Sequence, residues 1–224
     1  MLRPRVASRI RPGNPGDMFP PQTSPTRVLN FNRGYGYAVS GMSGVIAAAL
    51  PQDSLVLALL CDPQPAIAKP SQRLSMYVDR IHLAFTAIAA FTASISPGRR
   101  LAIYRATGPA ASGGTPLAIA RKDADNAPPS VCTSAQIATA AALTATGITR
   151  EPAPIGTLDL VHVGAAGARQ DFVFELAAPL NAPIAVGPGE LLVVGNPIAM
   201  DAGGTWQLTV KEAHWIEARR EETW

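Results

Sequence analysis

Histidine and cysteine are the residues of this chain best suited to metal or nucleophilic chemistry, and both are scarce. His82, His162 and His214 each lie in a stretch expected to be a strand, and none has a second ligand two or four residues away. Protein zinc sites usually draw their ligands from short, regular spacings. We therefore expect satisfied or exposed strand histidines, with no metal and no cofactor.

Carboxylates and glycines also fail to form a catalytic pattern. The stretch from Asp123 to Asn126 lacks the glycine and the terminal glutamate of a calcium-binding EF-hand loop. There is no GxSxG motif and no phosphate-binding loop. Glu212 and Glu217 are five positions apart in an expected strand, so they should point to opposite faces, with Glu217 belonging to a solvated charged terminus. The sequence thus predicts a protein that is not an enzyme.

The two cysteines, Cys61 and Cys132, are far apart and belong to no CxxC motif. Such residues commonly act as small buried hydrophobic side chains. We expect two buried thiols, while a disulfide between them stays open as the alternative.

Positive charge is concentrated in residues 1–27, which contain five arginines and one acid, Asp17, for a net charge of +4. Because the whole chain carries +3, the other residues sum to −1. Six prolines in the same segment predict an extended arm. Such an arm could contact an acidic protein surface or nucleic acid, or it could be a solvated tail. The candidate partner-binding residues are Arg3, Arg5, Arg9, Arg11 and Arg27.

The elements that would position these residues are predicted to be strands. Continuous apolar runs at 54–61 and 189–196 predict strands buried on both faces. Alternating or β-branched stretches predict further strands at 74–95, 101–107, 157–164, 171–178 and 205–217, although 84–93 also fits a helix. Alanine-rich residues 134–148 favour one short helix, with Ser134 as its cap. The fold class is mainly all-β, a β-sandwich or jelly roll.

The stretch from Gly189 to Glu217 combines an apolar run, glycine-containing turns and an alternating strand pattern. Trp206 and Val210 alternate with polar residues and should face the core. Unbroken alternation would turn His214 inward, whereas a bulge near 211–213 would bring Trp215 inward instead. We expect a structural hairpin, whose defining residues are Gly189, Glu190, Asn196, Gly203, Gly204, Trp206 and Trp215.

The chain is expected to have three parts: an extended arm and lead-in at 1–44, a single body at 45–217 and a charged tail at 218–224. Only 16% of the residues are charged, against about 25% in an average soluble domain, which favours a surface covered by partners. The apolar stretch 45–60 is interrupted by Pro51 and Asp53, so we expect no membrane span. The N-terminus lacks the apolar segment of a secretory signal, which predicts cytoplasmic synthesis.

Residues 74–217 contain the segment GELLVVGN with Asn196, the Gly203-Gly204-Thr205 turn and the final Trp215-Ile216-Glu217. In these features the chain resembles structural proteins of tailed bacteriophages. The chain departs from that pattern by having Gly-Glu-Leu where a second glycine is usual and by inserting Lys-Glu-Ala-His before the tryptophan.

This resemblance implies a virion protein made in the bacterial cytoplasm, with a capsid decoration or cement subunit as the expected role. Its implied partners are the major capsid protein and its own copies, as a dimer or trimer, and we expect no nucleic-acid partner. The alternative is a head-fibre or tail-associated module that binds a receptor or glycan. Exposed aromatic side chains in loops would favour that alternative, with Tyr35, Tyr37 and Trp224 as the candidates.

Overall fold

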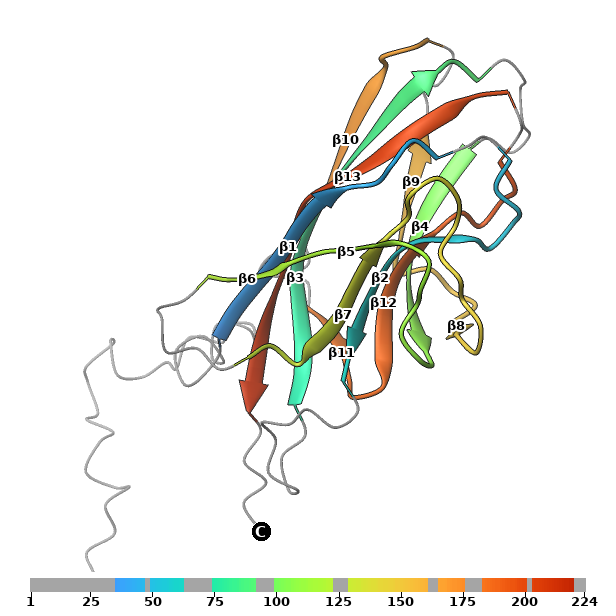
Figure 1. The fold of residues 1–224 in the computed structure, drawn as a ribbon. Helices are drawn as coiled ribbons and strands as arrows, with labels where there is room; N and C mark the ends of the chain where they lie inside the picture. Colours follow the sequence, from blue (N-terminus) through green and yellow to red (C-terminus); the bar gives the residue numbers. More distant parts are fainter. Residues whose placement is uncertain are drawn as a thin grey trace, which may run out of the picture.

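The chain folds into two antiparallel sheets that pack against each other (Figure 1). The structure, a computed structural model, describes residues 35–46, 49–62, 74–91, 99–122, 129–160, 165–175, 183–200 and 203–219. Every regular element within these ranges is a strand, so the predicted all-β fold is confirmed. Among the described residues there is no helix of a length and hydropathy suited to crossing a membrane. The predicted proline-rich arm and its five arginines lie outside the described residues.

Sheet A has the order β10-β3-β13-β1-β6, with β11 beside β3 on the same edge as β10. Its strands are β1 (Tyr35–Met42), β3 (Leu74–Ala89), β6 (Ile119–Arg121), β10 (Arg169–Glu175), β11 (Ile184–Val186) and β13 (Thr205–Arg219). Sheet B has the order β5-β7-β2-β12-β4-β8, with β9 also beside β4. Its strands are β2 (Leu55–Cys61), β4 (Arg99–Thr107), β5 (Thr115–Pro116), β7 (Cys132–Ile137), β8 (Thr149–Arg150), β9 (Gly156–Leu160) and β12 (Glu190–Gly195).

The strand pairs are nested about the middle of the chain. β4 pairs with β9, β3 with β10, β2 with β12, and β1 with β13. Apart from the step from β4 to β9, each successive strand of this set lies in the other sheet. Eight strands paired in this way form one long hairpin rolled into two sheets, which is the topology of a jelly roll.

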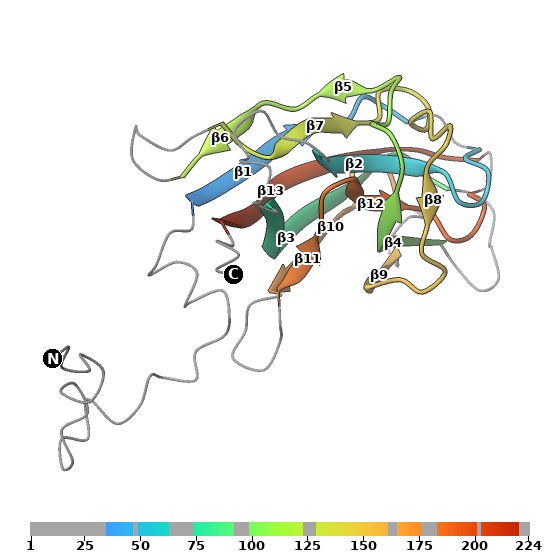
Figure 2. The same ribbon diagram turned by 90° about the horizontal axis from the view of Figure 1, so that it is seen from below.

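The remaining short strands widen the two sheets. β6 extends sheet A beside β1, and β7 and β5 extend sheet B beside β2. Because only two residues separate β5 from β6, the chain passes from one sheet to the other at this corner. Seen from below (Figure 2), β5 and β6 lie along one side of the molecule, and β9 and β11 lie at the opposite side.

The core lies between the sheets and contains the largest aromatic side chains. Tyr37 stacks with Trp215 at a centroid distance of 6.2 Å, and Phe85 stacks with Trp206 at 5.3 Å. All four side chains are buried. Both faces of β2 are buried, as its continuous apolar sequence predicts. The ambiguous segment that begins at residue 84 continues β3 as far as Ala89, and its described part, up to Phe91, contains no helix.

A β-bulge settles the register of the last strand. Val210 is paired with Leu83, and Glu212 is paired with His82, so Lys211 is an extra residue in β13. The partner on the other side shows the same step, because Val39 pairs with Ala213 and Gly41 with Val210. Trp206 and Trp215 therefore both point into the core, which confirms the second of the two registers considered from the sequence.

Two local predictions are wrong, the short helix at 134–148 and the lead-in outside the body. Residues 134–148 contain no helix: β7 extends to Ile137, with Ala135 and Ile137 buried while Ser134 and Gln136 lie on the other face. The expected lead-in is part of the body, because β1 is an internal strand of sheet A from Tyr35 onward. The glycine-rich composition of β1 obscured its alternation of small and large residues, which is the pattern of a strand.

The stretch from Gly189 to Glu217 is not a hairpin, because β12 lies in sheet B and β13 lies in sheet A. The connection from Asn196 to Gly204 is longer than the two to five residues of a usual hairpin loop. It can therefore cross the roughly 10 Å between packed sheets. Period-2 patterns identify strands, but they carry no information about which sheet each strand joins.

Candidate functional site

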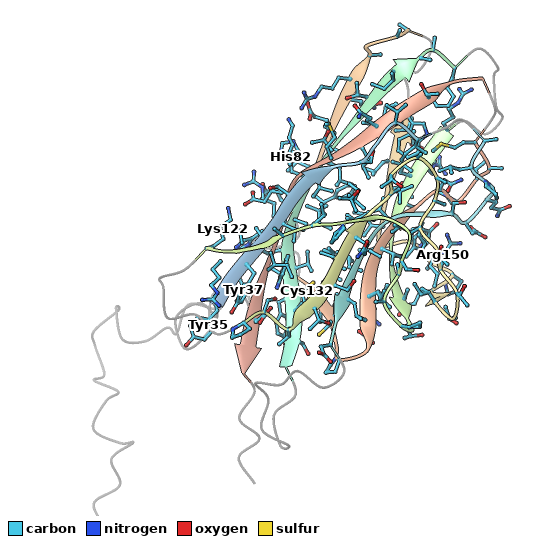
Figure 3. The ribbon with its side chains drawn as sticks, in the orientation of Figure 1. Tyr35, Tyr37, His82, Lys122, Cys132 and Arg150 are labelled. Atoms are coloured by element: carbon cyan, nitrogen blue, oxygen red, sulfur yellow. The ribbon has the colours of Figure 1, made fainter. Side chains whose placement is uncertain are left out.

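The most extensive cluster of charged side chains covers the outer face of sheet A, here called the charged face. It is built by strands β10, β3 and β13 and by the residue after β6. Its members are Asp79, Arg80, His82, Lys122, Arg169, Asp171, Glu175, Lys211, Glu212 and His214. Figure 3 labels His82 and Lys122 along sheet A, and Arg150, the last residue of β8, away from them.

Two acidic side chains are the centres of this network. Lys211 Nζ lies 2.7 Å from Asp171 Oδ1, and His82 Nε2 lies 3.6 Å from the same atom. Glu212 binds Lys122 Nζ at 2.9 Å and Arg80 at 3.7 Å. Lys122 follows β6 and must reach across β1, whose outward-facing residue there is the small Ala38.

The charged face is electrically balanced. Arg80, Lys122, Arg169 and Lys211 give +4, and Asp79, Asp171, Glu175 and Glu212 give −4, so the net charge is zero when the two histidines are neutral. The hydrogen bond from Lys211 holds the pKa of Asp171 below its ordinary value, and that from Lys122 does the same for Glu212. A balanced face of this kind suits a protein surface of mixed charge and lacks the basic patch that phosphates require.

The histidines are bound to carboxylates and show no metal geometry. His214 Nδ1 lies 2.6 Å from Asp79 Oδ1, and His82 lies beside Asp171. Across the part of the chain that the structure describes, no group of His, Cys, Asp and Glu side chains could hold a metal ion. His162 lies outside the described residues.

A second polar cluster is buried at one end of the core, around Glu217. Val131 donates its backbone N–H to both carboxylate oxygens at 3.0 Å, and Trp215 Nε1 donates at 2.9 Å. The Ser130 hydroxyl donates to Oε1 as well. Glu217 is only 5% exposed, so the expectation that this residue belongs to a solvated terminus is wrong. Burial raises the pKa of this carboxyl above its ordinary value, although the donors act in the opposite direction.

Two reduced thiols lie next to this cluster. Cys61 and Cys132 occupy paired positions on β2 and β7, and both are buried. Burial raises the pKa of Cys61 to about 12 and also raises that of Cys132. A thiol with so high a pKa is a poor nucleophile at neutral pH, so the pair has the character of core packing. The expectation of two buried thiols is confirmed.

The residues predicted to shape the Gly189–Glu217 stretch lie at two opposite ends of the sandwich. Gly189 has a φ of +79° in the turn before β12, and the Glu190 carboxylate accepts the Gly187 N–H at 2.7 Å. At the other end, the buried Asn196 amide donates to the carbonyls of Pro51 and Ile198. Gly204 is packed so tightly that a Cβ would lie 2.6 Å from the Phe91 ring, whereas Gly203 is exposed.

On sheet B, Arg150 forms a separate cluster at the edge. Its guanidinium lies 4.0 Å above the Tyr104 ring and pairs with Asp53 at 2.5 Å. Burial raises the pKa of Tyr104. The contact fastens the loop before β2 to β8 and presents no open site.

The aromatic residues proposed for glycan or receptor contact are differently placed. Tyr37 is fully buried against Trp215, and Tyr35 lies partly buried in β1 instead of in a loop. Trp224 lies outside the described residues. The charged face itself could have been suspected from the sequence, because polar residues alternate with buried ones in β3, β10 and β13, but its pairing could not.

No protein-family model, no curated protein and no solved structure matches this chain.

Proposed function

We propose that this chain is a structural protein of a tailed-bacteriophage particle, a decoration or cement subunit that binds the major capsid protein and stabilises the shell. The observation that carries the proposal is the pattern of turns and final strand that resembles such proteins, now seen to lie on a jelly roll. Jelly rolls build viral capsid proteins and also lectins and cupins.

Two physical features favour a protein partner over a small substrate. The charged face offers exposed donors and acceptors of both signs over a rigid sheet, which can match a mixed protein surface. The arginines of residues 1–27 add possible bidentate contacts to carboxylates on a shell. A subunit that combines a stiff body with the arm predicted from the sequence could span neighbouring capsomers.

The decisive experiment is quantitative mass spectrometry of purified phage particles from the host that carries this gene. A copy number close to that of the major capsid protein supports a decoration or cement role over the whole shell. A much smaller copy number would move the protein to a vertex, neck or tail and favour the head-fibre or tail-associated alternative. Absence from the particle would overturn the proposal.

A second test separates the contribution of the arm from that of the body. Deletion of residues 1–27 should leave the body folded, because every described strand lies beyond residue 34. The same deletion should weaken binding to purified capsid shells in a co-sedimentation assay. Replacing the five arginines by glutamine in the full chain is the matched control, since it removes the charge and keeps the length. Unchanged shell binding in both variants would remove the arm from the proposal.

A further inference from the structure

Strand β10 is an edge of sheet A that is well suited to a partner strand. Within the described residues it pairs with β3 alone. It is seven residues long and contains the exposed Val173, which is 48% accessible. An edge strand presents a row of unpaired N–H and C=O groups, which is a template for pairing with another chain. The opposite side of the sandwich is different, because there the chain itself crosses from β5 to β6.

The ladder shows which backbone groups of β10 are available. Ala87 donates its N–H to the carbonyl of Ala168 at 2.8 Å, in the same register that β10 continues. Hydrogen-bonded and non-hydrogen-bonded pairs alternate in an antiparallel ladder. The even-numbered residues 170–174 therefore bond to β3, and the odd-numbered residues 169–175 direct their N–H and C=O groups to the open edge.

A second copy of β10 can satisfy those groups across a two-fold axis. A residue whose N–H and C=O groups point to the open edge must lie opposite a residue of the same kind in the other copy. Odd-numbered residues therefore face odd-numbered residues, which requires the two-fold axis to pass through a residue and not between two. Two positions of the axis, at Phe172 and at Val173, pair most of the residues of β10. An axis at Val173 would place Asp171 opposite Glu175 of the other copy, which sets two like charges against each other twice. An axis at Phe172 places Arg169 opposite Glu175 of the other copy, which forms an opposite-charge pair twice.

We propose that the chain forms a two-fold dimer in which β10 pairs antiparallel with β10 of a second copy, centred on Phe172. In this register the two Phe172 side chains form a non-hydrogen-bonded pair, the closer kind of cross-strand contact. Arg169 and Glu175 are available for the new pairs, because their side chains are 52% and 61% exposed. Sheet A becomes continuous across both subunits. The inference rests on the edge strand and does not depend on the proposed function.

Charge reversal tests both the interface and its register in the full-length protein. Arg169→Glu alone sets two acids against each other across the axis, and Glu175→Arg alone sets two bases against each other. Each variant should self-associate about tenfold more weakly or worse than the wild type. An equimolar mixture of the two variants should recover the dimer, since both contacts are again opposite in sign. Sedimentation equilibrium measures all three, and thermal melting verifies that each variant is folded.

The control is Arg121→Glu in β6, an equal change of charge at the other edge of sheet A, which should leave the dimer unchanged. A wild type that stays monomeric at its highest soluble concentration would overturn the inference. So would a wild-type assembly that neither reversal weakens, because another surface would then hold it. Tighter association of Glu175→Arg would reject the Phe172 register in favour of Val173. A dimer measured for a protein absent from phage particles would refute the function and leave this inference standing.

Discussion

Trp215 Nε1 donates a hydrogen bond of 2.9 Å to Oε1 of Glu217, two residues further along the same face of β13. The same carboxylate accepts from Ser130 and Val131, which precede β7 in sheet B. A single buried side chain thus joins the last strand of sheet A to the other sheet. Because its partners are all donors, only an acceptor fits this position.

Replacement of Glu217 by alanine should destabilise the protein strongly. The change leaves the Trp215, Val131 and Ser130 donors buried without their acceptor. Each such group costs about 1–3 kcal/mol, and partial relaxation suggests a total of ~2–4 kcal/mol. Urea denaturation measures the loss. Glu212→Ala on the charged face is the control, and it should cost no more than about 1 kcal/mol. Equal losses for the two variants would refute a special role for the buried carboxylate.

The stability contributed by Glu217 should depend on pH. Burial raises its folded-state pKa above the ordinary 4.5, so the folded protein retains a proton that the unfolded chain releases. The contribution is fully present below pH 4.5 and is lost as the pH rises through the folded pKa. Glu217→Gln cannot titrate. The free energy of unfolding of the wild type minus that of this variant should therefore fall as the pH rises from 4.5, and a constant difference would contradict the raised pKa.

Trp206 should be among the most costly side chains to truncate. It is fully buried and stacks on Phe85, so Trp206→Ala should cost ~3–5 kcal/mol through lost contacts and the cavity left behind. The indole Nε1 finds no hydrogen-bond partner among the described residues. Trp206→Phe therefore loses no hydrogen bond and should cost much less than the alanine change. A melting temperature of Trp206→Ala equal to that of the wild type would show that this face of β13 is not core.

Most strands could be predicted from the sequence because their signal is local. The alternation in β4, β9, β10 and β13 and the apolar runs of β2 and β12 each identify a strand without reference to any partner. The same locality explains the errors. Alanine-rich β7 has helical composition, and its extended conformation depends on pairing with β2, which lies some 75 residues earlier. Tertiary pairing overrides propensity in such cases.

The site was less predictable than the fold. Glu217 lies at the edge of a charged terminus, and its burial depends on Ser130 and Val131, which are 87 and 86 residues away in sequence. The charged face joins strands whose neighbours along the chain lie in the other sheet, so spacing cannot reveal its ion pairs. Only the bulge at Lys211 could be considered in advance, because Trp206 and Trp215 are an odd number of residues apart and cannot share a face without it.

Deletion of Lys211 should test that bulge directly. Without the extra residue, Val210 and Glu212 become neighbours that pair with the consecutive residues Leu83 and His82, so the ladder becomes regular and Trp215 still points into the core. The deletion loses the local bend of the bulge and the exposed pair with Asp171 but no core contact, so it should fold and cost no more than about 2 kcal/mol. Lys211→Ala keeps the residue count and loses only the exposed pair with Asp171, so it should stay within about 1 kcal/mol of the wild type. Soluble yield, circular dichroism and urea denaturation compare the two, and a deletion variant that fails to fold would mean that Lys211 is not the extra residue of β13.

The two cysteines should be protected from thiol reagents until the protein unfolds. Burial raises the pKa of Cys61 to about 12 and raises that of Cys132 too, so almost none of either thiol is ionised near neutrality. In the native protein, reaction with Ellman's reagent at about pH 8 should be roughly a thousandfold slower than in urea, where both side chains are exposed and their pKa values return to about 8.5. The unfolded protein should release two equivalents of reporter, one for each cysteine. A Cys132→Ala variant should release one. Rapid reaction of the folded protein would contradict burial at the β2–β7 pair, and unfolded protein that released none would contain the disulfide that the structure does not have.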